Sequence, residues 1–160
     1  MGVRRRRTAA ARERRTPRLS GVLLHIVARG KIGRSPEAEL VERYLKRIAW
    51  PTKVTELGER APEPPAAANS VSIALDERGT ALSSADLARL LDSWRDGGKR
   101  EARFLIGAAA GHGDSERGKA DLLLSFGPAT WPHLLVRAML AEQLFRATSI
   151  LANHPYHREG

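Results

Sequence analysis

The end of the chain carries side chains that could do acid–base and recognition chemistry. The run Asn153–Glu159 contains two imidazoles, a phenol and a guanidinium, supplied by His154, Tyr156, His157 and Arg158. Chain ends usually carry few such groups. An imidazole, with a pKa of about 6.5, exchanges protons near neutrality, a guanidinium can stabilise developing negative charge, and a phenol can stack on a nucleobase. The composition of this tail therefore predicts a role in catalysis or substrate binding.

Several other kinds of chemistry find no support in the sequence. The chain has no cysteine, and neither HExxH nor CxxC occurs, so no zinc signature is present. No serine lies in a G-x-S-x-G elbow, and neither GxGxxG nor GxxxxGK[ST] is found. His133 is the one further imidazole that we expect close to the same site as the tail.

The predicted helix 133–151 must position this tail. The segment contains neither Gly nor Pro, and Thr130 and Pro132 supply start signals just before it. Apolar residues recur at three- and four-residue spacing, and they are Val136, Leu140, Leu144, Ala147 and Leu151. Further apolar residues cover most of the circumference, as in helices buried on two sides. We therefore expect the helix to pack on its own sheet and on a second subunit, with Met139 and Leu140 facing the partner.

Two arginines interrupt this apolar helix. Glu142 precedes Arg146 by four residues, which is the spacing of a helical ion pair. Arg137 has no such partner in the helix. We therefore expect Arg137 to lie at the edge of the subunit, where it contacts either the second subunit or an RNA phosphate.

The rest of the chain alternates between strand and helix signals. The predicted strands are 22–27, 53–57, 71–75, 102–106 and 122–124, and the predicted helices are 36–48 and 83–94, with a helical turn at 115–119 and a loop at 58–70. This alternation indicates an α/β fold with a mostly parallel sheet that helices cover on both faces. We expect one domain over residues 21–160.

The net charge of +9 is concentrated at the start of the chain. Residues 1–18 hold eight Arg and one Glu, which account for +7 of it. We therefore expect residues 1–20 to form a disordered basic arm that is not needed for folding. The arm is a nucleic-acid tether, a targeting segment, or the product of a start codon assigned too far upstream. The near-neutral remainder gives little support to an RNA-binding core held by charge alone.

Composition also bounds the setting of the protein. The lack of cysteine fits a reducing cytoplasm. No apolar run approaches the roughly 18 residues that span a bilayer, so we expect no membrane association.

A ligand site is expected where the strands end, because ligands of open α/β sheets bind beyond the carboxyl ends of the strands. Three such ends carry suitable loops, at Leu75–Asp76, Ile106–Gly107 and Ser125–Trp131. From spacing alone, these loops are either a nucleotide site or simple strand-to-loop connections.

Three motifs carry a resemblance to a known family. The segments WPHLLVR, LAEQLFRA and NHPYHRE resemble the signature of the RlmH family of SPOUT-class enzymes, and the similarity extends back to about Val22. The resemblance implies S-adenosylmethionine-dependent methylation of N3 of a pseudouridine in 23S ribosomal RNA on the assembled ribosome. It also implies a homodimer without a metal, and a deep trefoil knot formed by the carboxy-terminal segment.

The resemblance also assigns residues. It implies cofactor binding by the strand-end loops, at Leu75, Gly107, Phe126, Gly127, Pro128, Ala129, Thr130 and Trp131. We expect substrate contacts from His133, Arg137, His154 and Tyr156. Either His157 acts as a base on N3, or Arg158 stabilises the deprotonated imide electrostatically.

One loop departs from the pattern of the family. Relatives usually follow Gly107 with a second glycine and an acidic residue, whereas Ala108, Ala109 and Ala110 stand here. Two alternatives to an active enzyme follow: a catalytically impaired relative that binds the ribosome as an interaction module, and a general nucleotide-binding α/β protein.

Overall fold

The computed structural model describes residues 21–108 and 112–158. Its strands are β1 (Leu23–Arg29), β2 (Thr52–Leu57), β3 (Ser70–Ala81), β4 (Glu101–Ile106) and β5 (Leu122–Ser125). They form one sheet in the order β2-β1-β4-β3-β5, and all neighbouring strands are parallel. The predicted α/β fold with a parallel sheet is confirmed, whereas the basic arm predicted at residues 1–20 lies outside the described residues. The trefoil knot stays a prediction.

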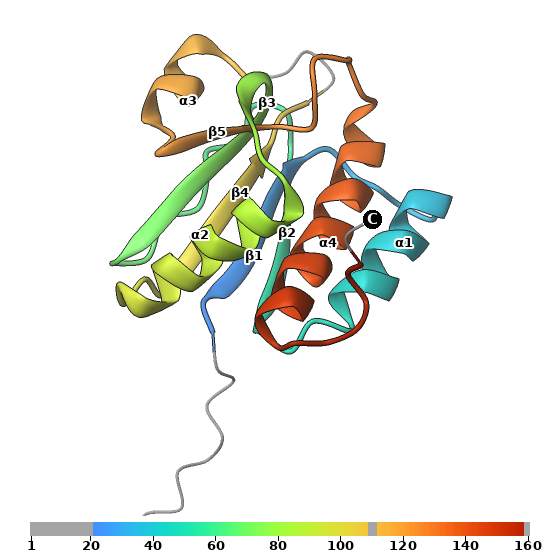
Figure 1. Ribbon diagram of the computed structural model, residues 1–160. Coiled ribbons are helices and arrows are strands. Elements are labelled where there is room, and N and C mark those ends of the chain that lie inside the picture. Colours follow the sequence, from blue (N-terminus) through green and yellow to red (C-terminus); the bar gives the residue numbers. More distant parts are fainter. Residues whose placement is uncertain (1–20, 109–111, 159–160) are drawn as a thin grey trace, which may run out of the picture.

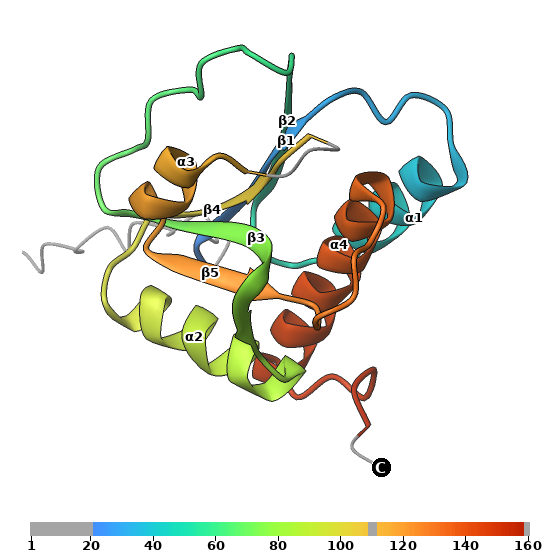
Figure 2. The ribbon, with the colours of Figure 1, turned by 90° about the horizontal axis from the view of Figure 1, so that it is seen from above.

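Helices lie on both faces of this sheet, but unequally. The helices are α1 (Pro36–Leu45), α2 (Ser84–Asp96), α3 (Asp114–Lys119) and α4 (His133–Leu151). Figures 1 and 2 show α1, α2 and α4 together on one face, while α3 and the extended segment between β2 and β3 cross the other. The three longer helices therefore cover one side of the sheet, and the Pro- and Ala-rich segment covers much of the other.

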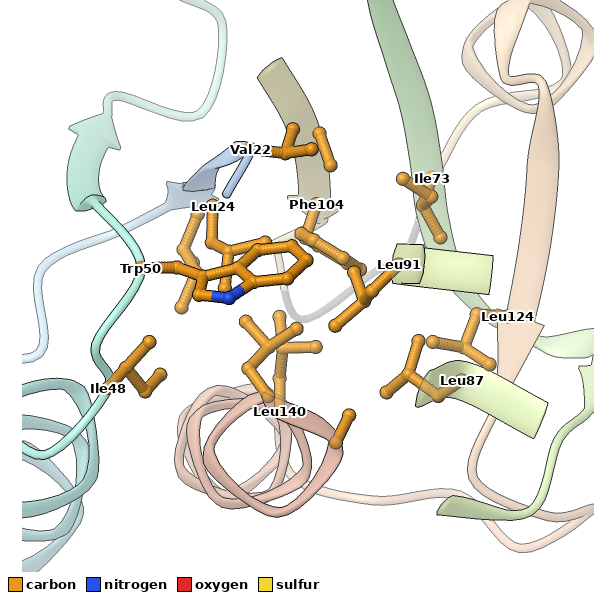
Figure 3. Close-up of a cluster of buried hydrophobic side chains, with 14 of the residues drawn as sticks. Val22, Leu24, Ile48, Trp50, Ile73, Leu87, Leu91, Phe104, Leu124 and Leu140 are labelled. Carbon is orange, nitrogen blue, oxygen red and sulfur yellow. The ribbon is translucent and has the colours of Figure 1, made fainter. Parts of the chain in front are cut away.

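The main core lies between the sheet and the three longer helices. Alternate residues of the central strands point into it, with Leu24 and Ile26 from β1, Ile73 from β3 and Phe104 from β4, all fully buried. Figure 3 shows Leu24, Ile73 and Phe104 meeting residues of α2, α4 and the α1–β2 connection, among them Leu87, Leu91, Leu140, Ile48 and Trp50. The intervening residues Val27, Ala74 and Leu105 form a smaller cluster on the opposite face.

Local start signals explain two of the helices. Ser35 caps α1 by accepting a hydrogen bond from the Ala38 amide at 3.1 Å, and Ser83 caps α2 through a capping box with Asp86. The start signal assigned to Thr130 is wrong, because α4 begins only at His133. The Thr130 hydroxyl instead donates to Glu77 at 2.9 Å.

Strand β3 runs further than its sequence indicates. The turn-forming residues 76–79 were expected to end it near Leu75, but the strand continues to Ala81 past an irregularity in its pairing with β5 between Leu75 and Thr80. Gly79 permits this close approach, since a Cβ there would lie 2.5 Å from the backbone of Leu123. Cross-strand pairing thus overrides the local turn signal.

The apolar circumference of α4 is largely covered within one chain. Helices α1 and α2 flank it, and Ala138 and Ala141 pack against Val41 of α1. Leu140 is 0% exposed, so its expected position facing a partner is wrong. The stripe of α4 that faces away from the sheet is half-buried and mixed in character, with Leu135, Met139, Glu142, Gln143, Arg146 and Ile150.

Candidate active site

A cavity of about 550 Å³ opens beside the irregular part of β3 and at the carboxyl ends of β4 and β5. Residues 75–78 of β3, the loops after β4 and β5 and the first turn of α4 enclose it. Its walls include the apolar side chains of Leu75, Ile106, Leu124, Phe126 and Val136. Its size and its mixed apolar and polar lining are typical of small-molecule sites.

The cavity brings together most of the residues expected to bind a cofactor. Seven of the eight line it, namely Leu75, Gly107, Phe126, Gly127, Ala129, Thr130 and Trp131. Pro128 belongs to the same loop but does not line the cavity. The predicted substrate residue His133 lies on the wall as well.

The loop after β5 is held by short-range hydrogen bonds. Ser125 Oγ accepts from the Gly127 amide at 3.0 Å and lies 3.2 Å from the Glu77 carbonyl oxygen, to which it can donate. Gly127 has φ of 104°, a conformation that favours glycine. The Trp131 indole N–H reaches the Phe126 carbonyl at 3.4 Å, and the ring remains 42% exposed. The loop therefore presents an aromatic surface beside the cavity.

Asp76 places a negative charge on the cavity wall. Burial alone would raise its pKa, but hydrogen bonds from the Arg78 amide (2.9 Å) and the Arg117 guanidinium (3.2 Å) bring the pKa below its usual range. The carboxylate is therefore ionised at neutral pH. Its charge is balanced by Arg117, with which it forms an ion pair, and Glu77 and Arg78 also line this side of the cavity.

Sequence reasoning missed several residues of the cavity. His112 lines it and is 7% exposed, so the expectation that only His133, His154 and His157 lie near the site is wrong. Glu77, Arg78 and Arg117 were also missed, and Asp76 was named only as part of a strand end without a role. The available signal was position, because His112 shares a loop with Gly107 and Asp76 directly follows Leu75.

Arg137, for which the sequence offers no ion-pair partner within the helix, pairs with a residue of the sheet. It is 1% exposed, pairs with Glu56 of β2 and donates to the Gly30 carbonyl at 3.2 Å. The hydrogen bond from Arg137 is the main cause of a lowered pKa of Glu56. Arg137 therefore forms its ion pair outside α4, with a residue far away in the sequence. A contact with an RNA phosphate would require the guanidinium to leave Glu56.

The tail folds back onto α4 of its own chain. The Tyr156 ring packs on Phe145 with 4.5 Å between centroids, and its hydroxyl donates to Glu142 at 3.1 Å. Arg146 donates to the same carboxylate, lies over the Tyr156 ring at 4.8 Å, and is 3.2 Å from Nδ1 of His157. The expected pair of Glu142 and Arg146 is thus present and also holds the tail.

The Tyr156 phenol is protonated in this arrangement. Burial, followed by the neighbouring Glu142 carboxylate, raises its pKa to about 12. The side chain can therefore donate a hydrogen bond or stack, but it does not supply a phenolate at neutral pH.

The tail and the cavity lie apart within one chain. Glu142, which holds Tyr156, is nine residues beyond His133, or about 14 Å along the helix axis. Arg146, beside His157, is about 20 Å from the same point. The expectation that His154 and His157 lie near the cofactor loops is therefore wrong for a single chain.

Residues 21–108 and 112–158 contain neither a metal-binding cluster nor a membrane-spanning helix. Within these ranges, no three His, Asp or Glu side chains gather in a way that could hold a metal ion. No helix in the described part of the chain is long and apolar enough to cross a membrane.

Comparison with known proteins identifies the family. A profile described as "Predicted SPOUT methyltransferase" matches residues 22–157. The chain is 64% identical over 141 residues to a protein from Novosphingobium aromaticivorans named "Ribosomal RNA large subunit methyltransferase H", a match that covers 87% of this chain and 100% of the relative. The chain belongs to the RlmH family of SPOUT methyltransferases. A relative of the same name from Erythrobacter litoralis is 65% identical over 142 residues, again covering 87% of this chain and 100% of its own length.

The RlmH fold also resembles more distant solved structures. A probable methylase family protein from Haemophilus influenzae superposes with a TM-score of 0.56 at 11% identity, covering 89% of this chain and 72% of that one. A probable methyltransferase from Bordetella pertussis gives 0.52 at 12% identity, covering 81% and 98%. At these identities the likeness concerns the fold alone.

Proposed function

We propose that the chain is an S-adenosylmethionine-dependent methyltransferase that modifies N3 of a pseudouridine in 23S ribosomal RNA on the assembled ribosome. The observation that carries the proposal is the cavity beside residues 75–78 of β3 and the carboxyl ends of β4 and β5, lined by seven of the residues that the resemblance assigns to cofactor binding. The names of the close relatives support ribosomal RNA as the substrate class.

The cavity fits S-adenosylmethionine in size and chemistry. Apolar side chains such as Leu75, Ile106 and Phe126 can bury a flat ring, and the charged side chains of Asp76 and Arg117 offer polar contacts on the same wall. When bound, the cofactor supplies an electrophilic methyl group on a sulfonium. The contribution of the protein is to align that group with the nucleophile and to exclude water.

The effect of the departure from the family pattern on cofactor binding can be tested at Ala108, because this residue lines the cavity. Replacing Ala108 by Gly removes one methyl group from the wall. We expect S-adenosylmethionine affinity to stay the same or to rise by up to about fourfold, the equivalent of one buried methyl group. Isothermal titration calorimetry measures this, with the exposed loop substitution Ala66→Gly as a control. Clear weakening by Ala108→Gly alone would contradict crowding at this position.

Residues of the chain must also handle the base. The exposed Trp131 ring next to His133 offers a stacking surface at the mouth of the cavity. N3 must lose its proton before it can accept a methyl group. His157 can take that proton as a general base, or Arg158 can stabilise the anion, whereas the protonated Tyr156 phenol is suited to stacking and hydrogen bonding.

A homodimer would bring the tail of one subunit to the cavity of the other. The cavity and the tail lie apart along α4 of one chain, so a tail can serve a cavity only if it unfolds from α4 or comes from a second subunit. The outward stripe of α4, which is half-buried and contains Leu135, Met139 and Ile150, is the surface that we propose for the partner. The active site would then combine the cavity of one subunit with the tail of the other.

Met139→Asp is the test of this interface. A buried, unpaired carboxylate is costly, so we expect the dissociation constant of the dimer to rise by at least about a hundredfold. Analytical ultracentrifugation at micromolar concentration measures it, with Ser93→Asp on the exposed side of α2 as the control. A wild-type protein that is already monomeric would rule out the interface.

The decisive experiment for the function is methyl transfer from labelled S-adenosylmethionine to ribosomes, followed by mapping of the modified base. Incorporation at N3 of a pseudouridine in 23S ribosomal RNA is the expected result. Ribosome binding without methyl transfer would instead support the alternative that the protein is a catalytically impaired relative. The reason to consider that alternative is the alanine at position 108, where the family usually has glycine. A protein that fails to bind the cofactor would contradict the proposed methyl transfer.

A further inference from the structure

The loop between β1 and α1 lies next to the cavity. Residues 30–34 of this loop are Gly-Lys-Ile-Gly-Arg. Strand β1 is parallel to β4, with Ala28 opposite Ile106, so the loop leaves the sheet at the same edge as the cavity. A Cβ on Gly30 would lie 4.0 Å from Nε2 of His133, which is part of the cavity wall. The loop therefore adjoins the mouth of the cavity.

One ion pair holds the backbone on both sides of Lys31. Arg137, which is 1% exposed, pairs with Glu56 and donates to the Gly30 carbonyl at 3.2 Å. On the other side, Oε2 of Glu56 accepts a hydrogen bond from the Ile32 amide at 2.8 Å. The residues before and after Lys31 are thus fixed by the same two side chains. Because loss of either side chain would leave the other charge unpaired, the ion pair keeps the backbone at Lys31 in one position.

Lys31 carries the charge that remains at this place. The charges of Arg137 and Glu56 balance each other. The pKa of Glu56 lies below its usual value, first because of the hydrogen bond from Arg137 and less because of the Ile32 amide and the nearby charge of Lys31. Lys31 itself is exposed, and within the described part of the chain its ammonium group makes no hydrogen bond and no ion pair. The group is therefore available to a ligand that approaches the cavity from outside.

We propose that Lys31 is a substrate-binding residue, which contacts a backbone phosphate of the ribosomal RNA next to the base that enters the cavity. This inference rests on the proposed methyl transfer to RNA. A base in the cavity stays joined to phosphates on both sides, and an ammonium group forms a charge-assisted hydrogen bond with a phosphate oxygen. Contacts of this kind position a nucleic acid without reading its sequence. The ion pair behind the loop then sets the distance between this phosphate and the cavity.

Arg34, the other exposed cation of the loop, is a weaker candidate for the same role. It is followed by Glu37 and Glu39 in the first turn of α1. These carboxylates offset its charge toward an approaching phosphate. Lys31 is therefore the residue on which we expect the RNA contact to depend.

Lys31→Met removes the charge and keeps the aliphatic part of the side chain. We expect the ribosome dissociation constant and the KM for ribosomes to rise by about tenfold, the effect of one lost hydrogen bond to a charged group. The kcat and the affinity for S-adenosylmethionine should change by less than about twofold, because Lys31 acts on binding of the RNA alone. The slope of log affinity against log salt concentration should become shallower by about 0.7–0.9, the value for one phosphate.

Two lysine variants serve as controls for this measurement. Lys31→Arg keeps the charge, so it should retain ribosome affinity within about threefold. Lys99→Met removes an exposed charge just before β4, at the amino edge of the sheet and away from the cavity. It should leave both the affinity and the salt slope at their wild-type values.

Gly30→Ala tests the position of Lys31 without changing any charge. Gly30 has φ of 91°, a conformation that L side chains rarely adopt, so alanine strains the backbone next to Lys31. We expect ribosome affinity to fall by about threefold or more, with S-adenosylmethionine affinity unchanged. Gly98→Ala, at a φ of 77° in the turn before β4, is the matched control, and a Cβ there would contact nothing within 4 Å.

The outcomes separate this proposal from the proposed function. A wild-type protein that transfers no methyl group to ribosomes contradicts the function itself. A wild type that does so, with Lys31→Met at the same KM and salt slope, overturns only the role of Lys31. A benzophenone side chain introduced at position 31 identifies the partner by photo-cross-linking to ribosomes. Cross-links to 23S ribosomal RNA support the phosphate contact, and cross-links to ribosomal protein alone overturn it.

Discussion

Ending the chain after Ala152 is expected to lower methyl transfer to ribosomes by at least about a hundredfold, the lower range for loss of a positioned proton-transfer group. The truncation removes His157 and Arg158 but leaves α4 and every residue of the cavity. S-adenosylmethionine affinity should therefore fall by less than about tenfold, or 1.4 kcal/mol. Transfer assays and calorimetry on the same preparation measure the two effects.

The truncated protein should remain folded and dimeric. The tail contributes the contact between Tyr156 and Phe145 and a hydrogen bond to Glu142, which together stabilise by roughly 1–3 kcal/mol. A loss of the cooperative thermal transition would mean that the tail is structural. Full activity without the tail would remove it from the mechanism.

Single substitutions in the tail separate its chemistry from its docking. His157→Ala should reproduce most of the loss if the imidazole is the base, and Arg158→Ala should do so if the imide is stabilised electrostatically. Tyr156→Phe is the matched control. It keeps the ring on Phe145, and because the pKa of the phenol is raised to about 12 the hydroxyl is not the base, so we expect a loss of less than about tenfold.

Mixing two inactive variants is expected to restore activity. One partner ends after Ala152 and has an intact cavity. The other carries Ala108→Trp, which fills part of the cavity, and has an intact tail. Random exchange makes half of the dimers mixed, and each mixed dimer has one complete site, so about a quarter of the wild-type rate should return. Each variant alone should stay below about one hundredth of the wild-type rate.

Native mass spectrometry provides the control for this mixing experiment, since it measures the fraction of mixed dimers directly. A mixture in which half of the dimers are mixed and activity does not return would contradict a site shared between subunits. An Ala108→Trp protein that still binds S-adenosylmethionine would be unsuitable, and a larger obstruction at Ala129 on the same wall would replace it.

The sequence by itself determined the elements and most of the cavity. Ser35 marks one helix start and either Ser83 or Ser84 marks another, and the structure places the caps at Ser35 and Ser83. The buried runs of β1 and β4 indicate a parallel sheet, and the strand-end rule then predicts that Leu75, Gly107 and the loop after β5 meet at one edge. These features follow from the sequence because each depends on neighbours along the chain or on a general property of parallel sheets.

Tertiary structure alone decided the features that depend on distant partners. Strand β3 continues past its turn signal because β5 pairs with it, and α4 is covered by α1 and α2. Arg137 pairs with Glu56, a residue 81 positions earlier in the chain, and His112 contacts the Leu105 carbonyl beside the cavity.

The separation of the tail from the cavity has the same origin. The sequence places both groups of residues on either side of one helix, but it does not say how far apart a straight helix holds them or where the tail folds back. The structure shows the tail held on α4 by Glu142, Arg146 and Phe145. Side-chain periodicity reports which face of an element is apolar, whereas the partner of that face is set by packing between elements far apart in sequence.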